Sequence, residues 1–307
     1  MKKLTAIIMA LIMVFSLGVS VFAADTTAKP FENSNYYTSG DYTIHYRTFE
    51  PAGSVKGQMF LIHGFCLSTV SLEGVAAEYA KAGYRVVLAD APDFGYSSRE
   101  NSKTELVDRE TVLYGLMQEL GGKWIVGGHS MGGGIAINLA TGYPEAVTGA
   151  ILFAPQTSAE ASGVTAMFMR SKVAQTLYRV VLKLALMFPQ VIVRALVEMS
   201  FSDKDYAADY DLSRITDPFT LPGSAEGVAI MASHTKGSDL EAFSKLDIPC
   251  VILTAKDDRV ANADNLQAII DNAPEGTVVE KDLEGGHMMM EYNPVLAAEL
   301  TLKAIEV

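Results

Sequence analysis

Cysteine is scarce in this chain of 307 residues, which contains only Cys66 and Cys250. Cys66 follows the carboxyl end of one predicted strand, whereas Cys250 begins another. In a parallel sheet these two positions lie at opposite edges, well beyond the roughly 7 Å between Cα atoms that a disulfide tolerates. We therefore expect no disulfide, even if the chain is exported to an oxidising compartment.

Signatures of cofactor and metal binding are also missing. The sequence has no dinucleotide fingerprint, P-loop or metal-ligand cluster, so neither a cofactor nor a metal is expected. Basic residues number 24 against 36 acidic ones, a balance that argues against nucleic-acid partners. Because linkers rich in proline and serine, low-complexity tracts and repeats are absent too, the length fits one large α/β domain or two smaller ones.

The first residues have the pattern of a secretory signal. Met1-Lys2-Lys3 precede an apolar run from Leu4 to about Val21, and Val21-Phe22-Ala23 places small residues where signal peptidase needs them. We predict a signal peptide over residues 1–23 and a secreted or otherwise extracytoplasmic protein that begins at Ala24. Without Lys2 and Lys3, 22 basic residues face 36 acidic ones, a net charge of −14. An uncleaved membrane anchor is the alternative, because the apolar run is almost long enough to span a bilayer.

Short apolar runs alternate with segments of helical period along most of the chain. This alternation predicts an α/β fold with a mostly parallel central sheet and helices on both faces. A strand over Tyr42–Phe49 and the run from Met59 onward are expected to supply one edge of the sheet. The predicted strands are Met59–Ile62, Arg85–Ala89, Trp124–Val126, Ala150–Phe153 and Cys250–Leu253, and the predicted helices are Val70–Ala82, Leu106–Leu120, Met131–Thr141, Asn265–Ile270 and Leu296–Ile305.

The alternation stops over residues 157–245. This stretch contains a long apolar helical pattern from Val164 to Phe188 and a second one from Val191 to Met199. We interpret it as a helical cap inserted between two strands, so that residues 24–156 and 246–307 form the two parts of one core. Its apolar face can simply pack over the active site. Alternatively, basic residues beside that apolar face indicate weak contact with an anionic membrane surface.

A G-x-S-x-G pentapeptide, Gly128-His129-Ser130-Met131-Gly132, follows the apolar run Trp124-Ile125-Val126 and precedes a stretch compatible with a helix. A serine on a tight turn between strand and helix projects its hydroxyl from the sheet edge, and the flanking glycines leave room for the strained backbone. Ser130 is therefore the candidate nucleophile. The alternative is a glycine-rich turn with an unreactive serine, which this strand, turn and helix disfavour.

A serine hydroxyl needs a neighbouring base, and the base needs an orienting acid. In this architecture the order along the chain is serine, acid, histidine. His234 and His287 follow Ser130, but His234 falls in the predicted cap, so His287, in a flexible loop after the last predicted strand, is the candidate base. Asp257 and Asp258 follow the strand that ends at Leu253, and spacing favours Asp258 as the acid.

Two backbone amides must also bind the oxyanion that forms when the serine attacks. The amide of Met131, directly after the nucleophile, is one candidate. The other is the amide of Phe65, in the loop opened by His63-Gly64-Phe65 at the end of a predicted strand. His63 and Gly64 are then expected to shape the loop and not to react.

These segments together resemble the α/β-hydrolase family, in particular its capped esterases and lipases. The resemblance covers nearly the whole mature chain and also includes the segment from Asp90 to Ser98. Two departures stand out: Ala255 replaces a usual glycine ahead of the acid, and Asp93 replaces the first glycine of an Asp-x-x-Gly-x-Gly pattern. Haloalkane dehalogenases of this fold carry aspartate where Ser130 stands, so dehalogenation is disfavoured.

The candidate triad and the resemblance predict a serine hydrolase that cleaves small-molecule carboxylic esters with an apolar acyl group through an acyl-enzyme. Other acyl-transfer chemistry on the same triad, as in a peptidase, thioesterase or perhydrolase, is the first alternative. The second is a binding protein that retains the triad but has negligible turnover, because fold alone decides function poorly.

Overall fold

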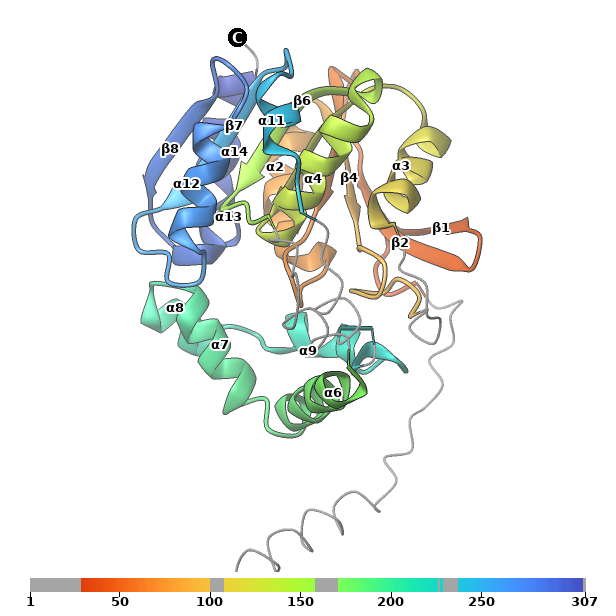
Figure 1. The fold of residues 1–307 in the computed structure, drawn as a ribbon, viewed down its shortest axis with the longest axis vertical. Helices are drawn as coiled ribbons and strands as arrows, with labels where there is room; N and C mark the ends of the chain where they lie inside the picture. Colours follow the sequence, from red (N-terminus) through yellow and green to blue (C-terminus); the bar gives the residue numbers. More distant parts are fainter. Residues whose placement is uncertain (1–28, 100–107, 158–170, 226, 229–236, 306–307) are drawn as a thin grey trace, which may run out of the picture.

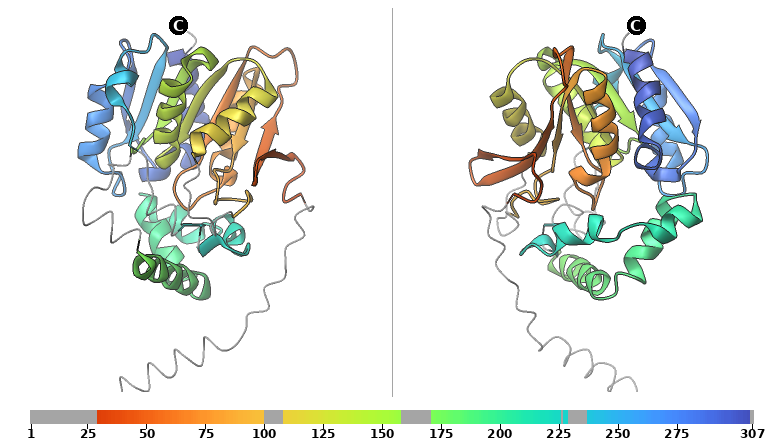
Figure 2. Two further views of the ribbon diagram at one scale, coloured as in Figure 1. Left: turned by 45° about the vertical axis from the view of Figure 1, so that its right-hand side comes forward. Right: turned by 180° about the vertical axis from the view of Figure 1, so that it is seen from behind.

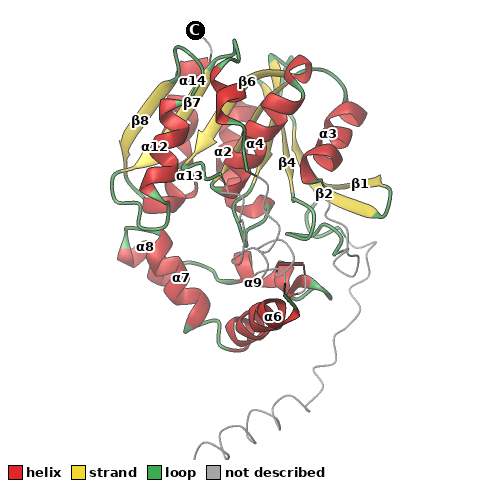
Figure 3. Cartoon of the chain, viewed as in Figure 1, coloured by secondary structure: helices red, strands yellow, loops and turns green. Residues whose placement is uncertain are grey.

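The computed structural model describes residues 29–99, 108–157, 171–225, 227–228 and 237–305. The predicted signal peptide, the part of the predicted long helix before residue 171, and His234 lie outside the described residues. A sheet with helices on both faces forms the upper part of the molecule in Figure 1, and a second group of helices lies below it. Figure 3 shows the same division by secondary structure.

Eight strands form one sheet in the order β1-β2-β4-β3-β5-β6-β7-β8. β2 is antiparallel to both of its neighbours, and all the other adjacent pairs are parallel. All five apolar runs predicted as strands are strands. The bounds are β1 Ser34–Ser39, β2 Tyr42–Phe49, β3 Gly57–Ile62, β4 Tyr84–Ala89, β5 Trp124–His129, β6 Val147–Phe153, β7 Cys250–Ala255 and β8 Val278–Leu283.

The two edges of the sheet differ from the expectation. β2 pairs with β1 and β4, so it does not form an edge with β3, which lies inside the sheet between β4 and β5. β1 and β8, at the outer edges, were missed by the sequence pattern. β8 is mostly exposed or half-buried and reads Val-Val-Glu-Lys-Asp-Leu, because an edge strand need not be apolar on both faces.

Helices cover both faces of the sheet, as the two views in Figure 2 show. Successive side chains of β3 point to opposite faces, so Phe60 and Ile62 join one apolar core while Met59 and Leu61 join the other. The first core includes α3 Arg109–Leu120, α4 Met131–Gly142, α11 Leu240–Ser244 and α12 Ala263–Asp271; the second includes α2 Glu73–Lys81, α13 Met289–Tyr292 and α14 Pro294–Ile305.

Below the sheet in Figure 1 lie described helices that come between β6 and β7, and we call them the insertion helices. They fall within the residues predicted as a cap. The chain breaks between the first two near Pro189, because a proline ring cannot continue a helix. The insertion helices are α6 Lys172–Met187, α7 Ile192–Ser200, α8 Lys204–Asp209 and α9 Ser213–Phe219.

Candidate active site

The strand order reverses around β3, since the chain passes from β3 to β4 on one side and then crosses to β5 on the other. Loops that leave adjacent strands at such a reversal diverge, and a crevice opens at the carboxyl ends of the strands. The loop after β3 starts at His63 and the turn after β5 starts at Ser130. The candidate oxyanion loop and the candidate nucleophile therefore meet at this crevice.

Ser130 has a strained backbone, with φ 52° and ψ −116°. A Cβ atom on Gly128 would lie 2.5 Å from the carbonyl of Gly132, and one on Gly132 would lie 2.1 Å from the carbonyl oxygen of Ile62. Only glycine fits at these two positions, which is the physical basis of the pentapeptide. Met131 is the first residue of α4, and the first amides of a helix have no partner within it. One of the two proposed oxyanion donors therefore lies beside the serine.

Asp258 and His287 are joined by a hydrogen bond of 2.7 Å from the imidazole Nδ1 to Oδ2. Oδ1 of Asp258 accepts the amides of Val260 at 2.8 Å and Ala261 at 2.9 Å. Burial opposes ionisation of this carboxyl, but the bond from His287 and the two amides outweigh it and hold the pKa of Asp258 below its ordinary value. The charged carboxylate of Asp258 therefore binds Nδ1 of His287, and Nε2 of the same ring makes no bond to Asp258.

His287 lies in a short 3-10 helix, Gly286–Met288, and is buried, not in the flexible loop that was expected. The insertion helices hold this segment. The amide of Gly285 donates to Ser202 Oγ at 3.2 Å, and a Cβ on Gly286, at φ 65°, would lie 2.7 Å from the carbonyl oxygen of Ser200. Arg259, next to the acid, donates to carbonyl oxygens at the end of α7.

His129 is a positioning group that the sequence reasoning missed. Its Nε2–H donates to the backbone carbonyl of His287 at 2.9 Å, and the two ring centroids are 4.6 Å apart. Complete burial keeps the pKa of His129 well below its ordinary value, so the ring stays neutral. The only sequence signal was its place between Gly128 and Ser130, which says nothing about a contact 158 residues away.

His63 fixes the direction of the peptide that carries the candidate Phe65 donor. The amide of Ala91 donates to His63 Nε2 at 3.1 Å, so Nδ1 carries the proton and donates to the carbonyl of Gly64 at 2.7 Å. Because the peptide between Gly64 and Phe65 is planar and trans, its N–H points opposite to that carbonyl. Burial lowers the pKa of His63, which keeps the ring neutral, so that Nε2 can accept the amide of Ala91. His63 thus shapes the loop, as expected.

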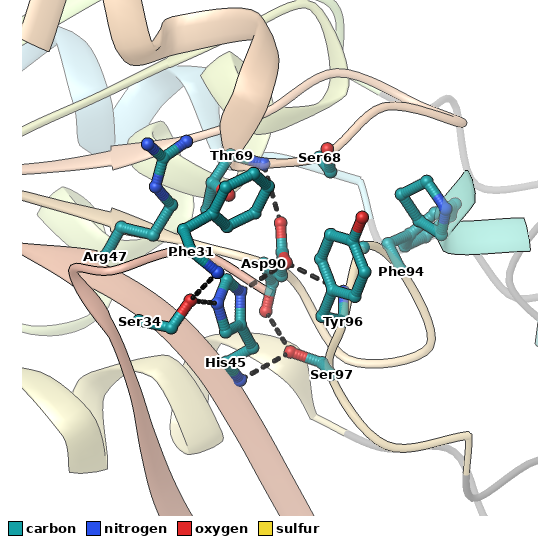
Figure 4. A network of polar contacts seen from close by, with 12 residues as sticks. Phe31, Ser34, His45, Arg47, Ser68, Thr69, Asp90, Phe94, Tyr96 and Ser97 are labelled. Atoms are coloured by element: carbon teal, nitrogen blue, oxygen red, sulfur yellow. Dashed lines mark hydrogen bonds and ion pairs between the residues drawn. The ribbon is translucent and has the colours of Figure 1, made fainter. Parts of the chain in front are cut away.

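A buried network behind this loop is centred on Asp90, at the end of β4 (Figure 4). Its carboxylate accepts the amides of Thr69 and Tyr96 at 2.7 and 2.8 Å, and His45 Nδ1 lies 2.7 Å away. Ser34 Oγ lies 2.8 Å from His45 Nε2, so serine, histidine and aspartate repeat the residue types of a triad. All three side chains are fully buried, which leaves no room for substrate and makes the network structural.

Asp93 takes the place of a glycine in the resemblance, and its backbone has φ 68°. Aspartate is one of the few residues besides glycine that adopts this left-handed conformation readily. The next glycine of the pattern, Gly95, has φ 53°, and a Cβ there would lie 2.0 Å from the Asp90 carboxyl carbon. The backbone is therefore left-handed at both Asp93 and Gly95, the two positions where the pattern has glycine.

Ser130 and His287 line one cavity of about 350 Å³ between the sheet and the insertion helices. Phe65 lines it too, Asp258 is joined to it through the bond with His287, and Met131 follows Ser130 directly in the chain. The described lining contains no aspartate, glutamate, lysine or arginine. Its walls are apolar, with Leu67 and Met288 from the core and Leu182, Leu186, Val193 and Val197 from the insertion helices.

Arg214, in α9, links the insertion helices to the core. Its guanidinium contacts Glu73 Oε1 at 2.8 Å and Glu291 Oε1 at 2.9 Å, and Tyr210 donates to the same Glu291 oxygen at 3.0 Å. Burial lowers the pKa of Arg214, but the two carboxylates outweigh it and keep the guanidinium charged. Burial raises the pKa of Glu291 to about 7 despite this ion pair, so the carboxyl is the partner that titrates near neutral pH.

A family model described as serine aminopeptidase, S33, matches residues 53–291, a range that contains Ser130, Asp258 and His287. A 2-hydroxy-6-oxononadienedioate/2-hydroxy-6-oxononatrienedioate hydrolase from Burkholderia vietnamiensis is 37% identical over 105 residues, 33% of this chain and 36% of that protein. A protein of the same description from Paraburkholderia phymatum is 34% identical over 146 residues, 44% of this chain and 48% of that protein. The chain thus spans between about a third and a half of these relatives.

Solved structures share the fold over most of the chain. An esterase from Exiguobacterium antarcticum has a TM-score of 0.69 at 18% identity and covers 89% of this chain and 99% of its own. A thermophilic esterase from Thermogutta terrifontis has a TM-score of 0.64 at 20% identity, with 88% and 97% covered. At this level of identity the likeness concerns architecture alone.

Proposed function

The chain belongs to the serine aminopeptidase S33 family of α/β-hydrolases, and from this we propose that it is an exported serine hydrolase that cleaves carboxylic esters through an acyl-enzyme. Its membership makes it a hydrolase. The ester substrate, the roles of the individual site residues and the export are the parts that we propose.

In the proposed reaction Ser130 Oγ attacks the ester carbonyl while His287 Nε2 takes its proton. Asp258 stabilises the imidazolium that forms, and the amides of Phe65 and Met131 bind the oxyanion. The tetrahedral intermediate collapses, His287 gives the proton to the leaving alcohol, and the acyl group stays on Ser130. A water, activated by His287, then releases the carboxylic acid and restores the serine.

We propose an uncharged ester as the substrate because the wall of the cavity is apolar. An aminopeptidase has to accommodate the substrate ammonium, and the dioate hydrolases to which the chain is similar act on a compound with two carboxylates. Burying either charge without a partner is costly. Since the described lining offers no carboxylate and no cation, an uncharged apolar ester fits it best.

The test uses the purified mature protein with p-nitrophenyl esters of graded acyl length, alongside aminoacyl p-nitroanilides. We expect a burst of p-nitrophenol followed by turnover on the esters, and little cleavage of the anilides. Ser130→Ala and His287→Ala should each lower kcat by on the order of a millionfold, because members of a triad act as a unit. A fluorophosphonate probe should label Ser130 alone.

Two results would reject the proposal. A Ser130→Ala protein that is still labelled and still hydrolyses esters would show that the nucleophile lies elsewhere. A protein whose melting temperature rises with ester analogues but which gives neither burst nor turnover would be a binding protein that retains the triad.

A further inference from the structure

The outer face of α6 exposes large apolar side chains to solvent. Val173, Leu177 and Val181 are 71%, 59% and 52% exposed. Residues four apart lie on one face of a helix, so these three form a continuous stripe. The stripe continues at the end of α6 and in the turn to α7, where Met187, Phe188 and Val191 are 50%, 51% and 69% exposed.

This stripe is separate from the substrate cavity. Leu182 and Leu186 line the cavity, and by the helical period they lie on the opposite side of α6 from Val173 and Leu177. Figures 1 and 2 show α6 as the outermost described helix at the lower end of the molecule. Substrate binding therefore explains the apolar character of the inner face of α6 but not that of its outer face.

A basic stripe runs along another side of the same helix. Lys172, Arg179 and Lys183 are seven and four residues apart, which places them together along one side of α6. With Arg194, the segment Lys172–Ser200 has four basic residues against the single acidic Glu198, in a chain whose net charge is −12. Positive charge is thus concentrated on the same pair of helices as the exposed apolar residues.

We propose that the outer face of α6 and the turn to α7 bind the surface of an anionic phospholipid bilayer. The apolar stripe would enter the boundary between headgroups and acyl chains while the lysines and arginine contact phosphate. Charge complementarity favours this partner over a second copy of the chain, because a two-fold contact through α6 brings two positively charged helices close together.

The proposed surface also adjoins the cavity. Leu196 and Met199 of α7 line the cavity and are 51% and 43% exposed, so the mouth of the cavity opens on the same pair of helices. Among the described residues no single helix is long and apolar enough to cross a membrane, and α6 and α7 meet that test only as a pair bent by 93°. An apolar ester dissolved in a bilayer would reach Ser130 from this side.

Vesicle binding tests the surface independently of the proposed reaction if the mature Ser130→Ala protein is used. We expect co-sedimentation with vesicles of phosphatidylglycerol and phosphatidylcholine at low salt, release at high salt, and little binding to phosphatidylcholine alone. Leu177→Glu with Val181→Glu should weaken binding at least about tenfold, since charged residues replace the buried apolar contact. Val55→Glu with Val295→Glu, two exposed valines far from α6 in the sequence, is the matched control.

Reversing the charge of lysines tests the electrostatic contribution to vesicle binding separately. Lys172→Glu with Lys183→Glu should abolish binding at low salt, whereas Lys281→Glu with Lys303→Glu, which changes the net charge equally on β8 and α14, should preserve most of it. Each variant is also made in the protein that retains Ser130, and its activity on a soluble short-chain ester is measured. This activity should be unchanged, which shows that the variants fold.

Equal binding by the α6 variants and their controls, or no binding of the unaltered face to anionic vesicles at low salt, would overturn the proposal. So would a concentration-dependent dimer that Leu177→Glu with Val181→Glu converts to monomer, because a second copy would then cover the face. In the active protein, the rate should also rise when substrate passes its solubility limit.

Discussion

Asp257 and Asp258 are adjacent carboxylates in one loop, yet they have different surroundings. Asp258 accepts one bond from His287 and two from backbone amides, whereas the structure gives the buried Oδ1 of Asp257 no hydrogen-bond partner among the described atoms. The difference is set by direction, because consecutive side chains in a turn point different ways. At the residue scale a shift of one position separates the candidate acid from its neighbour.

Asp258→Asn should lower kcat by on the order of ten-thousandfold, because an amide cannot hold His287 in the tautomer that leaves Nε2 ready to accept a proton. Asp257→Asn, the matched control, should cost far less. Steady-state kinetics on one p-nitrophenyl ester compare the two. The opposite ranking would move the acid one residue back and leave Ser130 and His287 in place.

His129→Phe should lower kcat by about tenfold to a hundredfold with little change in KM. The ring volume is kept, but the carbonyl of His287 loses its donor in a buried place, a cost of about 1–3 kcal/mol. His129→Gln, which can still donate, should recover part of the loss. The pH profile of kcat is the second readout, since a displaced imidazole titrates differently. A Phe variant with the kcat and pH profile of the unaltered protein would show that His129 only fills space.

At the scale of elements, the site depends on contacts between the insertion helices and the segment around His287. Arg214 of α9 holds both α2 and α13, and Glu291 of α13 is four residues from His287. Oε2 of Glu291 is buried without a hydrogen-bond partner among the described atoms. Burying a carboxylate oxygen in this way costs free energy when the group is charged. The link between the two regions should therefore respond to pH.

Glu291 should make the protein less stable as pH rises from about 5 to about 7. Its pKa is raised to about 7 in the folded chain, so in this range the folded state holds more protons than the unfolded one. Stability then falls with pH, by a few kcal/mol at most. Melting temperatures at pH 5 and pH 8 should show this fall in the unaltered protein and a smaller one in Glu291→Gln.

Glu241→Gln is the matched control, because Glu241 forms an exposed pair with Lys245 and should leave the pH dependence unchanged. Identical pH dependence in Glu291→Gln and the unaltered protein would mean that the Glu291 carboxyl stays charged throughout this range and that Arg214 fully compensates its burial.

At the scale of the whole molecule, the candidate substrate cavity lies where the core and the insertion helices meet. Its candidate catalytic groups come from the loops after β3, β5, β7 and β8, whereas Leu182, Leu186 and Val193 come from the insertion. Acyl preference should therefore change with the insertion while the chemistry stays the same.

Leu186→Trp should reduce kcat/KM for a long-chain ester by about tenfold or more while the acetyl ester is little affected. The larger ring fills part of the cavity of about 350 Å³, and one methylene in an apolar pocket is worth about 1–3 kcal/mol. Leu177→Trp, on the outer face of the same helix, is the control. If both variants keep the unaltered chain-length profile, acyl chains do not occupy this cavity.

The mature protein should begin at Ala24 when the full chain is expressed in a bacterial host. The apolar run that ends before Ala23 has the composition of a cleaved signal peptide. Intact mass of the protein recovered outside the cytoplasm measures this directly. A full-length chain found in the membrane fraction would identify the run as an uncleaved anchor.

Local patterns alone determined most of the architecture. Strands buried on both faces, β3 to β7, must be apolar throughout, so each is visible as a short run. Ser130 could be recognised as a candidate because the space that its strained turn needs is provided within the pentapeptide, by glycines two residues away on either side. Strands β3 to β7, the main flanking helices and the candidate nucleophile were therefore predicted from the sequence.

Contacts between distant parts of the chain decided the rest. β1 and β8 were missed because edge strands are half-exposed and carry polar residues, and their pairing depends on the neighbouring strand. The contact of His129 with His287 joins residues 158 apart, and that of Arg214 with Glu73 joins residues 141 apart. The sequence shows which groups can form hydrogen bonds, but only the packed sheet and the insertion helices decide which of them meet.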